Sequence, residues 1–472
     1  MTGEKKDAAF AFAHHVVSVK YEDIPEEAIQ ASKADILDAL GVALASSTTT
    51  PACREMAELV KEFGGKEESS IIAYGGKVPC YMAAFVNAAL VHSLNYNDLF
   101  DAYWVHPGSV LLPSALAIAE RVENVSGREF IVAYTIGLDI MGRLGRAIFP
   151  PVPLREWAVY SWLPPQIFGY FGAAGIAGRL LGLDENQMVS AFGLAYCQTA
   201  GNMEPLFGLG ADKGIYPAYP AQAGLLSALM AQKNILGPSN SLEGEAGLFN
   251  VYFQGDYDSD SLTTDLGKDF KGVELGLYAF PCCGWSQIYI TTALQMIDEH
   301  KIVPQDVESV TIYAGPRAKH LCEPLEVRRN PRNLTEAQMS IPFILAIIIV
   351  KGKPRIEHFT GEGLGDSEVL RLSNKVSWQP DPTCDRRYGT GVSKAKIEMT
   401  LKGGKVIGAE QEGFRYGHPQ NPIEKEDLLE KFRDCASFSA KPISKESVEK
   451  IIDIVEHLEE LPDVSQIMEL VT

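Results

Sequence analysis

The sequence predicts a mainly α protein, with one large all-α helical domain and a smaller α+β domain. Apolar side chains recur every three and four residues through most of residues 8–265, as they do on the buried face of a helix. Alternating apolar and polar side chains, typical of strands, stand out only between residues 270 and 408. The chain has 472 residues, more than the ~100 to 200 of a typical domain. We therefore expect an all-α domain over 1–268, an α+β domain over 269–408, and C-terminal helices over 409–472 that return to the first domain.

The first domain reads as a series of packed helices. Residues 24–47 begin with Pro25 and two glutamates, which suit the positive end of a helix dipole, and then continue with helical spacing. Further helical patterns cover residues 81–94, 114–122, 127–148, 168–201 and 220–234. Many of them carry alanine or glycine at apolar positions, which lets neighbouring helix backbones approach closely.

The second domain combines strands with a buried helix. Residues 307–315 and 396–411 alternate apolar and polar side chains, and Gly403-Gly404 inside the second range indicates a hairpin turn. Residues 337–352 read as a buried helix. We expect antiparallel strands and helices over 270–408, followed by amphipathic helices in the tail.

Composition excludes several classes of partner. The chain is 46% hydrophobic and 22% charged, with a formal net charge of −19. Nucleic acids and anionic membranes require a basic surface, so neither is an expected partner. No stretch reaches the ~18 apolar residues of a membrane span, and the N-terminus lacks a secretory signal pattern. We expect a cytoplasmic protein.

Cofactor motifs are absent from the sequence. The eight cysteines are scattered, and only Cys282 and Cys283 are adjacent, so no zinc or iron–sulfur ligand spacing occurs. The sequence contains no Walker loop, no dinucleotide-binding glycine motif after a strand, no HExxH and no GxSxG. We expect no metal and no cofactor.

Four polar residues stand in unusual surroundings. His106 lies between an acid and amide cluster and an apolar helix, and histidine suits proton transfer near neutral pH. Asp98 and Asp101 precede it, where a capping role is the alternative. Lys213 is the only cation in a long stretch rich in glycine, proline and tyrosine, and it could hold a carboxylate, act as a base, or be a surface lysine.

An aromatic loop, YAFPCCGWSQ, covers residues 278–287 at the expected domain boundary. It contains Tyr278 and Trp285. Domain boundaries often contain ligand pockets, although a packing role explains the loop equally well.

The order of several segments resembles the MmgE/PrpD family. These segments are AAFVNAALVHSLNYND, HPGSVLLPSALAIAE, FGAAGIAGRLLGLDENQ, GPSNSLEGEAGLF, YAFPCCGWSQ, TEAQMSIPF and RYGHPQNPIEKEDLLEKF. The family includes 2-methylcitrate dehydratase, cis-aconitate decarboxylase and iminodisuccinate epimerase. The resemblance covers nearly the whole chain and implies an all-α domain, an α+β lid, a homodimer, and a metal-free site between the domains for small carboxylic acids.

The family's acidic stretch before its His-Pro-Ser is altered in this chain. His106 and Asp98 match family positions, whereas the leading carboxylate is replaced by Asn95 and a threonine by Leu99. One extra residue precedes His106-Pro107-Gly108.

Other family positions are altered as well. Leu163 takes the place of a second family histidine, and Lys213 is kept while Tyr216 takes the place of the histidine that follows it. A family lysine falls near Tyr278 and a later histidine near Gln287. The expected pocket is therefore less cationic and more apolar or aromatic.

Together with the resemblance, these residues imply a cofactor-independent lyase of the dehydratase or hydratase type. It would act α,β to a carboxylate of a small organic acid that is less carboxylated or more hydrophobic than methylcitrate. The expected catalytic residues are His106, Lys213 and Asp98, and the expected substrate-binding residues are Asn95, Leu163, Tyr216, Tyr278 and Trp285. The alternatives are an isomerase or epimerase that works by α-proton transfer, and a catalytically silent ligand-binding relative.

Overall fold

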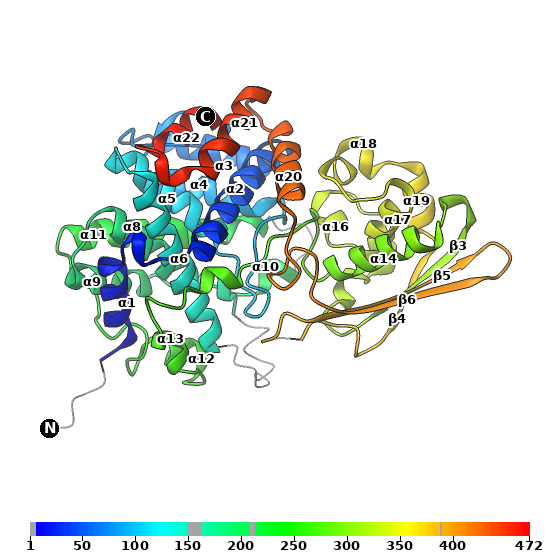
Figure 1. Ribbon diagram of the computed structural model, residues 1–472, viewed down its shortest axis with the longest axis horizontal. Coiled ribbons are helices and arrows are strands. Elements are labelled where there is room, and N and C mark those ends of the chain that lie inside the picture. Colours follow the sequence, from blue (N-terminus) through cyan, green and yellow to red (C-terminus); the bar gives the residue numbers. More distant parts are fainter. Residues whose placement is uncertain (1–5, 149–161, 208–212, 388) are drawn as a thin grey trace. The chain divides into compact units, whose positions relative to one another are not determined.

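The chain forms two compact units. The computed structural model describes residues 6–148, 162–207, 213–387 and 389–472 (Figure 1). The first unit comprises the chain up to Gly276 together with Leu428–Thr472, and the second comprises Leu277–Asp427. The observed boundaries, after Gly276 and after Asp427, lie later along the chain than those expected at 268/269 and 408/409. The first unit is almost entirely helical and the second adds a four-stranded sheet, which confirms the predicted mainly α fold class.

The long helices of the first unit follow the predicted periodicity. α2, for example, has Glu26 and Glu27 in its first turn, directly after Pro25. In the described ranges before the second unit, the α-helices are α1 (Ala8–Ser18), α2 (Glu26–Thr49), α3 (Pro51–Phe63), α4 (Cys80–Ser93), α5 (Gly108–Val122), α6 (Gly127–Ile148), α8 (Pro164–Leu180), α9 (Glu185–Tyr196), α10 (Glu204–Phe207), α11 (Ala218–Gln232), α12 (Leu248–Phe253) and α13 (Asp260–Thr263). α20 (Lys425–Ser437) begins in the last residues of the second unit and continues into the first, and α21 (Lys445–Glu456) and α22 (Ser465–Val471) follow. α21 packs against α2.

One helical stretch is divided in the structure. Residues 168–201, expected to be helical, contain two helices, α8 and α9. Gly182 has a φ of 68°, a left-handed conformation that ends α8. Asp184 then caps α9 by accepting from the Gln187 N–H at 2.9 Å, while the Gln187 side chain returns a bond to the Asp184 N–H at 3.1 Å.

Small residues stand where the helices meet. A Cβ added to Gly224 of α11 would lie 2.4 Å from the Cβ of Ala173 in α8, and one added to Gly172 of α8 would lie 2.7 Å from the Met141 side chain in α6. Larger side chains would push these helices apart, because protein cores are already close-packed.

The first unit also contains a short β-hairpin that the all-α prediction did not include. β1 (Ser69–Ser70) pairs with β2 (Lys77–Val78) in an antiparallel arrangement. Gly75 and Gly76 form the turn with φ values of 61° and 79°. Strands of two residues are too short to give an alternating pattern, which is why the sequence did not reveal them.

The second unit contains a mixed sheet with the strand order β4-β3-β5-β6. Its strands are β3 (Val307–Ala314), β4 (Val376–Pro380), β5 (Ser393–Leu401) and β6 (Val406–Gly413). β5 and β6 form the predicted hairpin, with Gly403 and Gly404 at φ values of 88° and 81° in its turn. The expectation of antiparallel strands throughout was wrong for one pair. β3 and β4 are parallel, because the helical connection between them brings the chain back to the same end of the sheet.

Helices cover one face of this sheet. The predicted buried helix is α17 (Ile341–Lys351), which forms one core with α14 (Gln287–His300) and with inward-facing residues of β3 and β5 such as Ile312 and Ile397. The shorter helices of this unit are α15 (Leu325–Arg329), α16 (Leu334–Gln338), α18 (Gly361–Leu364) and α19 (Ser367–Ser373). α17 is apolar along its length but has only 11 residues, and none of the helices in the described ranges could cross a lipid bilayer.

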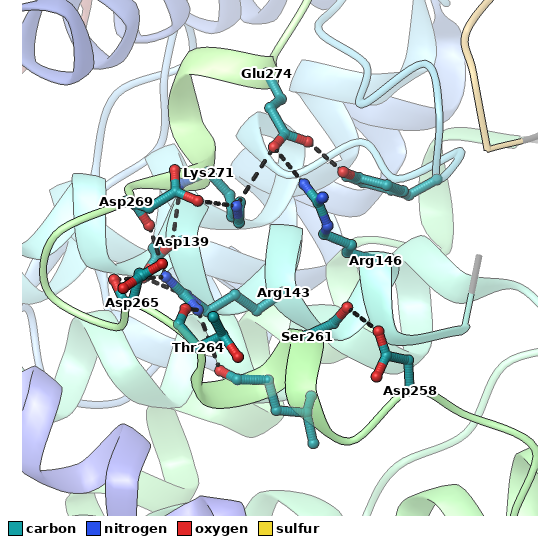
Figure 2. A network of polar contacts seen from close by, with 12 residues as sticks. Asp139, Arg143, Arg146, Asp258, Ser261, Thr264, Asp265, Asp269, Lys271 and Glu274 are labelled. Atoms are coloured by element: carbon teal, nitrogen blue, oxygen red, sulfur yellow. Dashed lines mark hydrogen bonds and ion pairs between the residues drawn. The ribbon is translucent and has the colours of Figure 1, made fainter. Parts of the chain in front are cut away.

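A buried polar network fixes residues 258–276 against α6 (Figure 2). The Arg143 guanidinium pairs with Asp139 at 2.9 Å and donates to the carbonyl oxygens of Thr264 and Asp269 at 2.8 and 2.6 Å. The other Asp139 oxygen accepts from the Lys271 N–H at 2.9 Å. Burial alone would raise the pKa of Asp139, but hydrogen bonding from His15 and the charge of Arg143 outweigh it and lower that pKa. The pair is therefore ionised, with hydrogen bonds on both partners.

This network continues to the loop between α4 and α5. Glu274 accepts from Arg146 at 2.9 Å and from the Tyr103 hydroxyl. Next to it, Leu99 and Gly276 exchange backbone hydrogen bonds of 2.7 and 2.9 Å. The loop at residues 94–107 is thus attached to the last residues of the first unit before the chain enters the second.

Candidate active site

The loop at residues 94–107 contains three of the eight predicted site residues, Asn95, Asp98 and His106, and is held by its own backbone. The Phe100 N–H donates to the Val105 carbonyl at 2.8 Å. Asn95 and Trp104 have φ values of 52° and 55°, so the chain turns sharply at both residues. The loop ends at Pro107, directly before α5.

His106 is held in one tautomer by this loop. Its side chain is buried, and Nδ1 lies 2.5 Å from the carbonyl oxygen of Asp98. A carbonyl oxygen only accepts hydrogen bonds, so Nδ1 carries a proton. In the neutral ring the lone pair is then on Nε2, which is the atom able to take up a proton.

A second histidine lies beside His106. His92 is the penultimate residue of α4, and its ring centroid is 5.0 Å from that of His106 and 4.5 Å from that of Tyr216. Its Nδ1 lies 3.0 Å from Oδ1 of Asn97. The sequence analysis did not single out His92. The available signal was a histidine in the last turn of an alanine-rich helix, directly before the acid and amide cluster.

An apolar cluster adjoins the two histidines. Leu163, Met203 and Tyr216 are buried together, with Trp104 packed against them. Through Tyr216, whose ring contacts His92, this cluster continues to the imidazole pair. The structure therefore brings together four of the predicted residues, Asp98, His106, Leu163 and Tyr216.

The backbone of the Lys213 segment lies against the end of α4. Lys213 begins a short 3-10 helix, η2 (Lys213–Ile215), and its side chain lies outside the described part of the structure. A Cβ added to the next residue, Gly214, would lie 1.9 Å from Oγ of Ser93, the neighbour of His92. The role of the Lys213 side chain stays a prediction.

Asp98 connects the loop to the start of α5. Its carboxyl group accepts from Nδ2 of Asn97 at 2.7 Å and from the Gly108 N–H at 2.8 Å. The side chain is completely buried, and burial raises the pKa of Asp98 to about 7 despite these two donors. Asp98 therefore titrates near neutral pH.

Two further aspartates of α2 lie in the same buried region. Asp35 accepts from the Tyr134 hydroxyl at 2.7 Å, and burial followed by the nearby charge of Asp98 raises its pKa well above the ordinary value. Asp38 pairs with Lys431 of α20 at 2.5 Å. One ammonium thus faces three buried carboxyl groups, and we infer that Asp35 is protonated, since a second uncompensated charge in this region would be costly.

We expect Asp98 to make the folded state less stable as pH rises. Because its pKa in the folded chain is about 7 and the ordinary value is ~4, the folded chain keeps a proton that the unfolded chain has lost between these two pH values. The Asp98 contribution to the free energy of unfolding should then fall by up to ~1.4 kcal/mol per pH unit in that window and stay constant above it. Denaturant unfolding of the wild-type chain and of Asp98→Asn between pH 4 and 8 checks this. Parallel stability curves for the two proteins would refute it.

Gly108 is expected to tolerate no side chain. A Cβ at this position would lie 2.9 Å from an oxygen of Asp35 and 2.9 Å from an oxygen of Asp98. Gly108→Ala should therefore destabilise the fold by ~1 to 3 kcal/mol, as overpacking of a buried site does. Gly365→Ala is a matched control, because its added Cβ comes no closer than 3.7 Å to any neighbour. Equal thermal stability of the two variants would contradict the expectation.

Two predicted binding residues belong to the second unit. Tyr278 is buried, with the Arg415 guanidinium 4.8 Å from its ring centroid. Trp285 is half-buried and packs edge-on against His320, with 4.8 Å between the ring centroids. Their place in one site with His106, like the binding role of the half-buried Asn95, stays a prediction. Among the described residues, no three His, Cys, Asp or Glu side chains are grouped so as to hold a metal ion.

Comparison with known proteins identifies relatives along nearly the whole chain. Three of them are the cis-aconitate decarboxylase-like protein oryM of Aspergillus oryzae and the cis-aconitate decarboxylases of Homo sapiens and Aspergillus terreus. The first is 27% identical, over 97% of this chain and 95% of the relative. The second is 25% identical, over 98% and 93%, and the third is 24% identical, over 99% and 96%.

Two family models match consecutive parts of the sequence. The model of the MmgE/PrpD N-terminal domain matches residues 11–260, and that of the MmgE/PrpD C-terminal domain matches residues 280–460. The chain therefore belongs to the MmgE/PrpD family.

Proposed function

We propose that this chain is a lyase that acts on a small carboxylic acid, adding or removing water α,β to the carboxylate. Its family and its relatives, which include cis-aconitate decarboxylases, support a lyase that processes carboxylic acids. The residues around His106 are the reason for proposing dehydration or hydration and a substrate with few carboxylates.

The observation that carries the proposal is the imidazole pair beside an apolar cluster. His92 and His106 are suited to proton transfer, and Leu163, Met203 and Trp104 present apolar or aromatic surface next to them. A substrate held there would place a reacting carbon near an imidazole and a hydrophobic part against that surface. These surroundings suit an acid with fewer carboxylates, or a bulkier apolar group, than methylcitrate.

His106 and Lys213 would move the protons. The Nε2 atom of a neutral His106 can take the α-proton, because Nδ1 is already protonated and donates to Asp98. The electrons of the broken C–H bond form an enolate, which Asn95 and tyrosine hydroxyls would stabilise by hydrogen bonds. Expulsion of the β-hydroxyl as water then needs a proton donor, for which Lys213 is a candidate.

Decarboxylation is the second candidate, and the names of the relatives favour it. Both reactions form a carbanion. In dehydration it lies next to a carboxylate and expels the β-hydroxyl as a leaving group, and in decarboxylation it lies next to an alkene and is protonated. The two candidates differ in which bond breaks, C–O or C–C. Leu163 and Tyr216, at family histidine positions, favour a substrate with fewer carboxylates than cis-aconitate, which suits neither reaction over the other but makes cis-aconitate itself a poor substrate.

A panel of mono- and dicarboxylic β-hydroxy acids and their enoates, with cis-aconitate included, tests the proposal. The reactions are run in heavy water. The expected result is that a β-hydroxy acid of the panel loses water to give an enoate that absorbs in the ultraviolet, or that an enoate of the panel is hydrated and its absorbance falls. Release of carbon dioxide would establish the decarboxylase instead. Deuterium exchange at the α-carbon without elimination would establish an epimerase, and thermal stabilisation by a ligand that is never converted would establish a binding protein.

We also propose a cytoplasmic homodimer. The alanine-rich helices offer more apolar surface than one helical layer needs, and dimers are expected from the family resemblance. Light scattering at micromolar concentration should give about twice the chain mass of 51.5 kDa. A mass near 51.5 kDa would refute the dimer.

A further inference from the structure

The hydrogen bonds around His92 select which of its nitrogens can react. Oδ1 of Asn97 lies 3.0 Å from His92 Nδ1, and Nδ2 of Asn97 lies 2.7 Å from an Asp98 oxygen. Above the Asp98 pKa of about 7 its carboxylate is ionised and only accepts, so at such pH the amide nitrogen must face Asp98 and the amide oxygen must face His92. His92 Nδ1 is therefore protonated, and in the neutral ring Nε2 carries the lone pair.

Asp98 thus sets the tautomer of both histidines. Its backbone carbonyl accepts from Nδ1 of His106 at 2.5 Å, and its carboxylate orients Asn97, which in turn accepts from His92. The second carboxylate oxygen is held by the Gly108 N–H at 2.8 Å.

The short distance between the two rings favours a pair in which only one ring is positively charged. The ring centroids are 5.0 Å apart and both side chains are buried, so two positive charges on the pair would repel each other at close range. The stable charged form of the pair has one imidazolium and one neutral imidazole. This is one acid and one base, the combination that β-elimination requires.

We propose that His92 is the second proton-transfer residue of this site, acting through Nε2 as the partner of His106, and that Asn97 is the positioning residue that selects this nitrogen. The inference rests on the proposed function and deepens it. One imidazole takes the α-proton, the C–H electron pair forms the enolate, and the C–O bond breaks as the hydroxyl takes a proton from the other imidazolium. The pair of histidines carries one extra proton both before and after the step. It is on one ring before the step and on the other ring after it. Lys213 is then left to hold the carboxylate.

Nuclear magnetic resonance tests the tautomer without any substrate. In protein labelled with ¹⁵N-histidine at pH 8, where Asp98 is ionised, we expect the His92 signals to show a proton on Nδ1, with the assignment made by their loss in His92→Gln. Asn97→Leu removes the acceptor and should shift His92 towards the Nε2-protonated form. A proton on Nε2 of His92 in the wild-type chain would overturn the proposal.

Two substitutions at His92 separate proton transfer from structure. The side-chain nitrogen of asparagine occupies the place of histidine Nδ1, so His92→Asn can still donate to Asn97 but has no group at Nε2. We expect His92→Asn and His92→Gln to fold and to lower turnover by ~10²-fold or more on whichever acid of the panel the wild-type chain converts fastest. A folded His92→Asn variant with wild-type turnover would mean that the role of His92 is structural.

The outcome for His106 separates this proposal from the proposed function. If His106→Ala abolishes turnover while His92→Asn does not, the function stands and the inference about His92 is wrong. If no acid of the panel is converted, the proposed function fails and the tautomer of His92 alone decides whether Asn97 selects its nitrogen.

Discussion

Replacing His106 or Lys213 by alanine is expected to lower turnover by ~10²-fold or more while leaving the fold intact, because each removes a group that handles a proton or the substrate carboxylate. His106 is the better defined of the two, since its Nδ1 is committed to the Asp98 carbonyl at 2.5 Å and Nε2 is left as the basic atom. Lys213 follows from the sequence and from its place at the start of η2. Steady-state kinetics on the best acid of the panel, with circular dichroism to check folding, provide the measurement.

Exposed residues of the same types are the matched controls. His300→Ala and Lys233→Ala remove a histidine and a lysine from the surface, and both variants should keep wild-type turnover. If the double variant of His106 and Lys213 is folded and still turns over at the wild-type rate, the mechanism is wrong and a ligand-binding role becomes the better explanation.

Local periodicity accounts for most of the fold that could be predicted. Long helices such as α2 and α6 repeat their apolar positions many times, and the β5–β6 hairpin combines alternation with a Gly-Gly turn. β4 could not be found in this way, because its five residues, VSWQP, are only partly buried and depend on pairing with β3. The orientation of that pair depends on the helical connection, which no local pattern encodes.

The site was predictable only where its chemistry is local. His106 stands out because it follows an acid and amide cluster and precedes a Pro-Gly turn. His92 reads as one more residue of an alanine-rich helix, and its importance appears only when α4, the loop and Tyr216 come together. Lys431 binds the Tyr96 carbonyl across 335 residues of sequence. A single sequence contains no signal for such a contact.

That distant lysine gives the second large effect. We expect Lys431→Met to destabilise the first unit by ~3 to 5 kcal/mol, the range found when one partner of a buried ion pair is removed. Lys431 Nζ lies 2.5 Å from Asp38 Oδ1, donates to the Tyr96 carbonyl at 2.6 Å, and lies 3.9 Å from the centroid of the Tyr96 ring. Without this ammonium, the region around Asp35, Asp38 and Asp98 keeps its carboxyl groups and loses their nearby positive charge. Denaturant unfolding of the variant, with the exposed Lys450→Met on α21 as control, measures the effect.

The double variant shows whether charge is the cause. Asp38→Asn keeps the shape of the side chain and removes its charge, so adding it to Lys431→Met should recover a large part of the lost stability, with a coupling energy of ~0.5 to 3 kcal/mol between the two sites. Recovery should be incomplete, because the Tyr96 carbonyl still lacks its donor and the loop that carries His106 is attached less firmly. The double variant should therefore turn over more slowly than the wild-type chain, even if its stability comes close to the wild-type stability. Strictly additive losses would instead indicate that the methylene stem of Lys431, packed in the core, contributes the stability and that its charge does not.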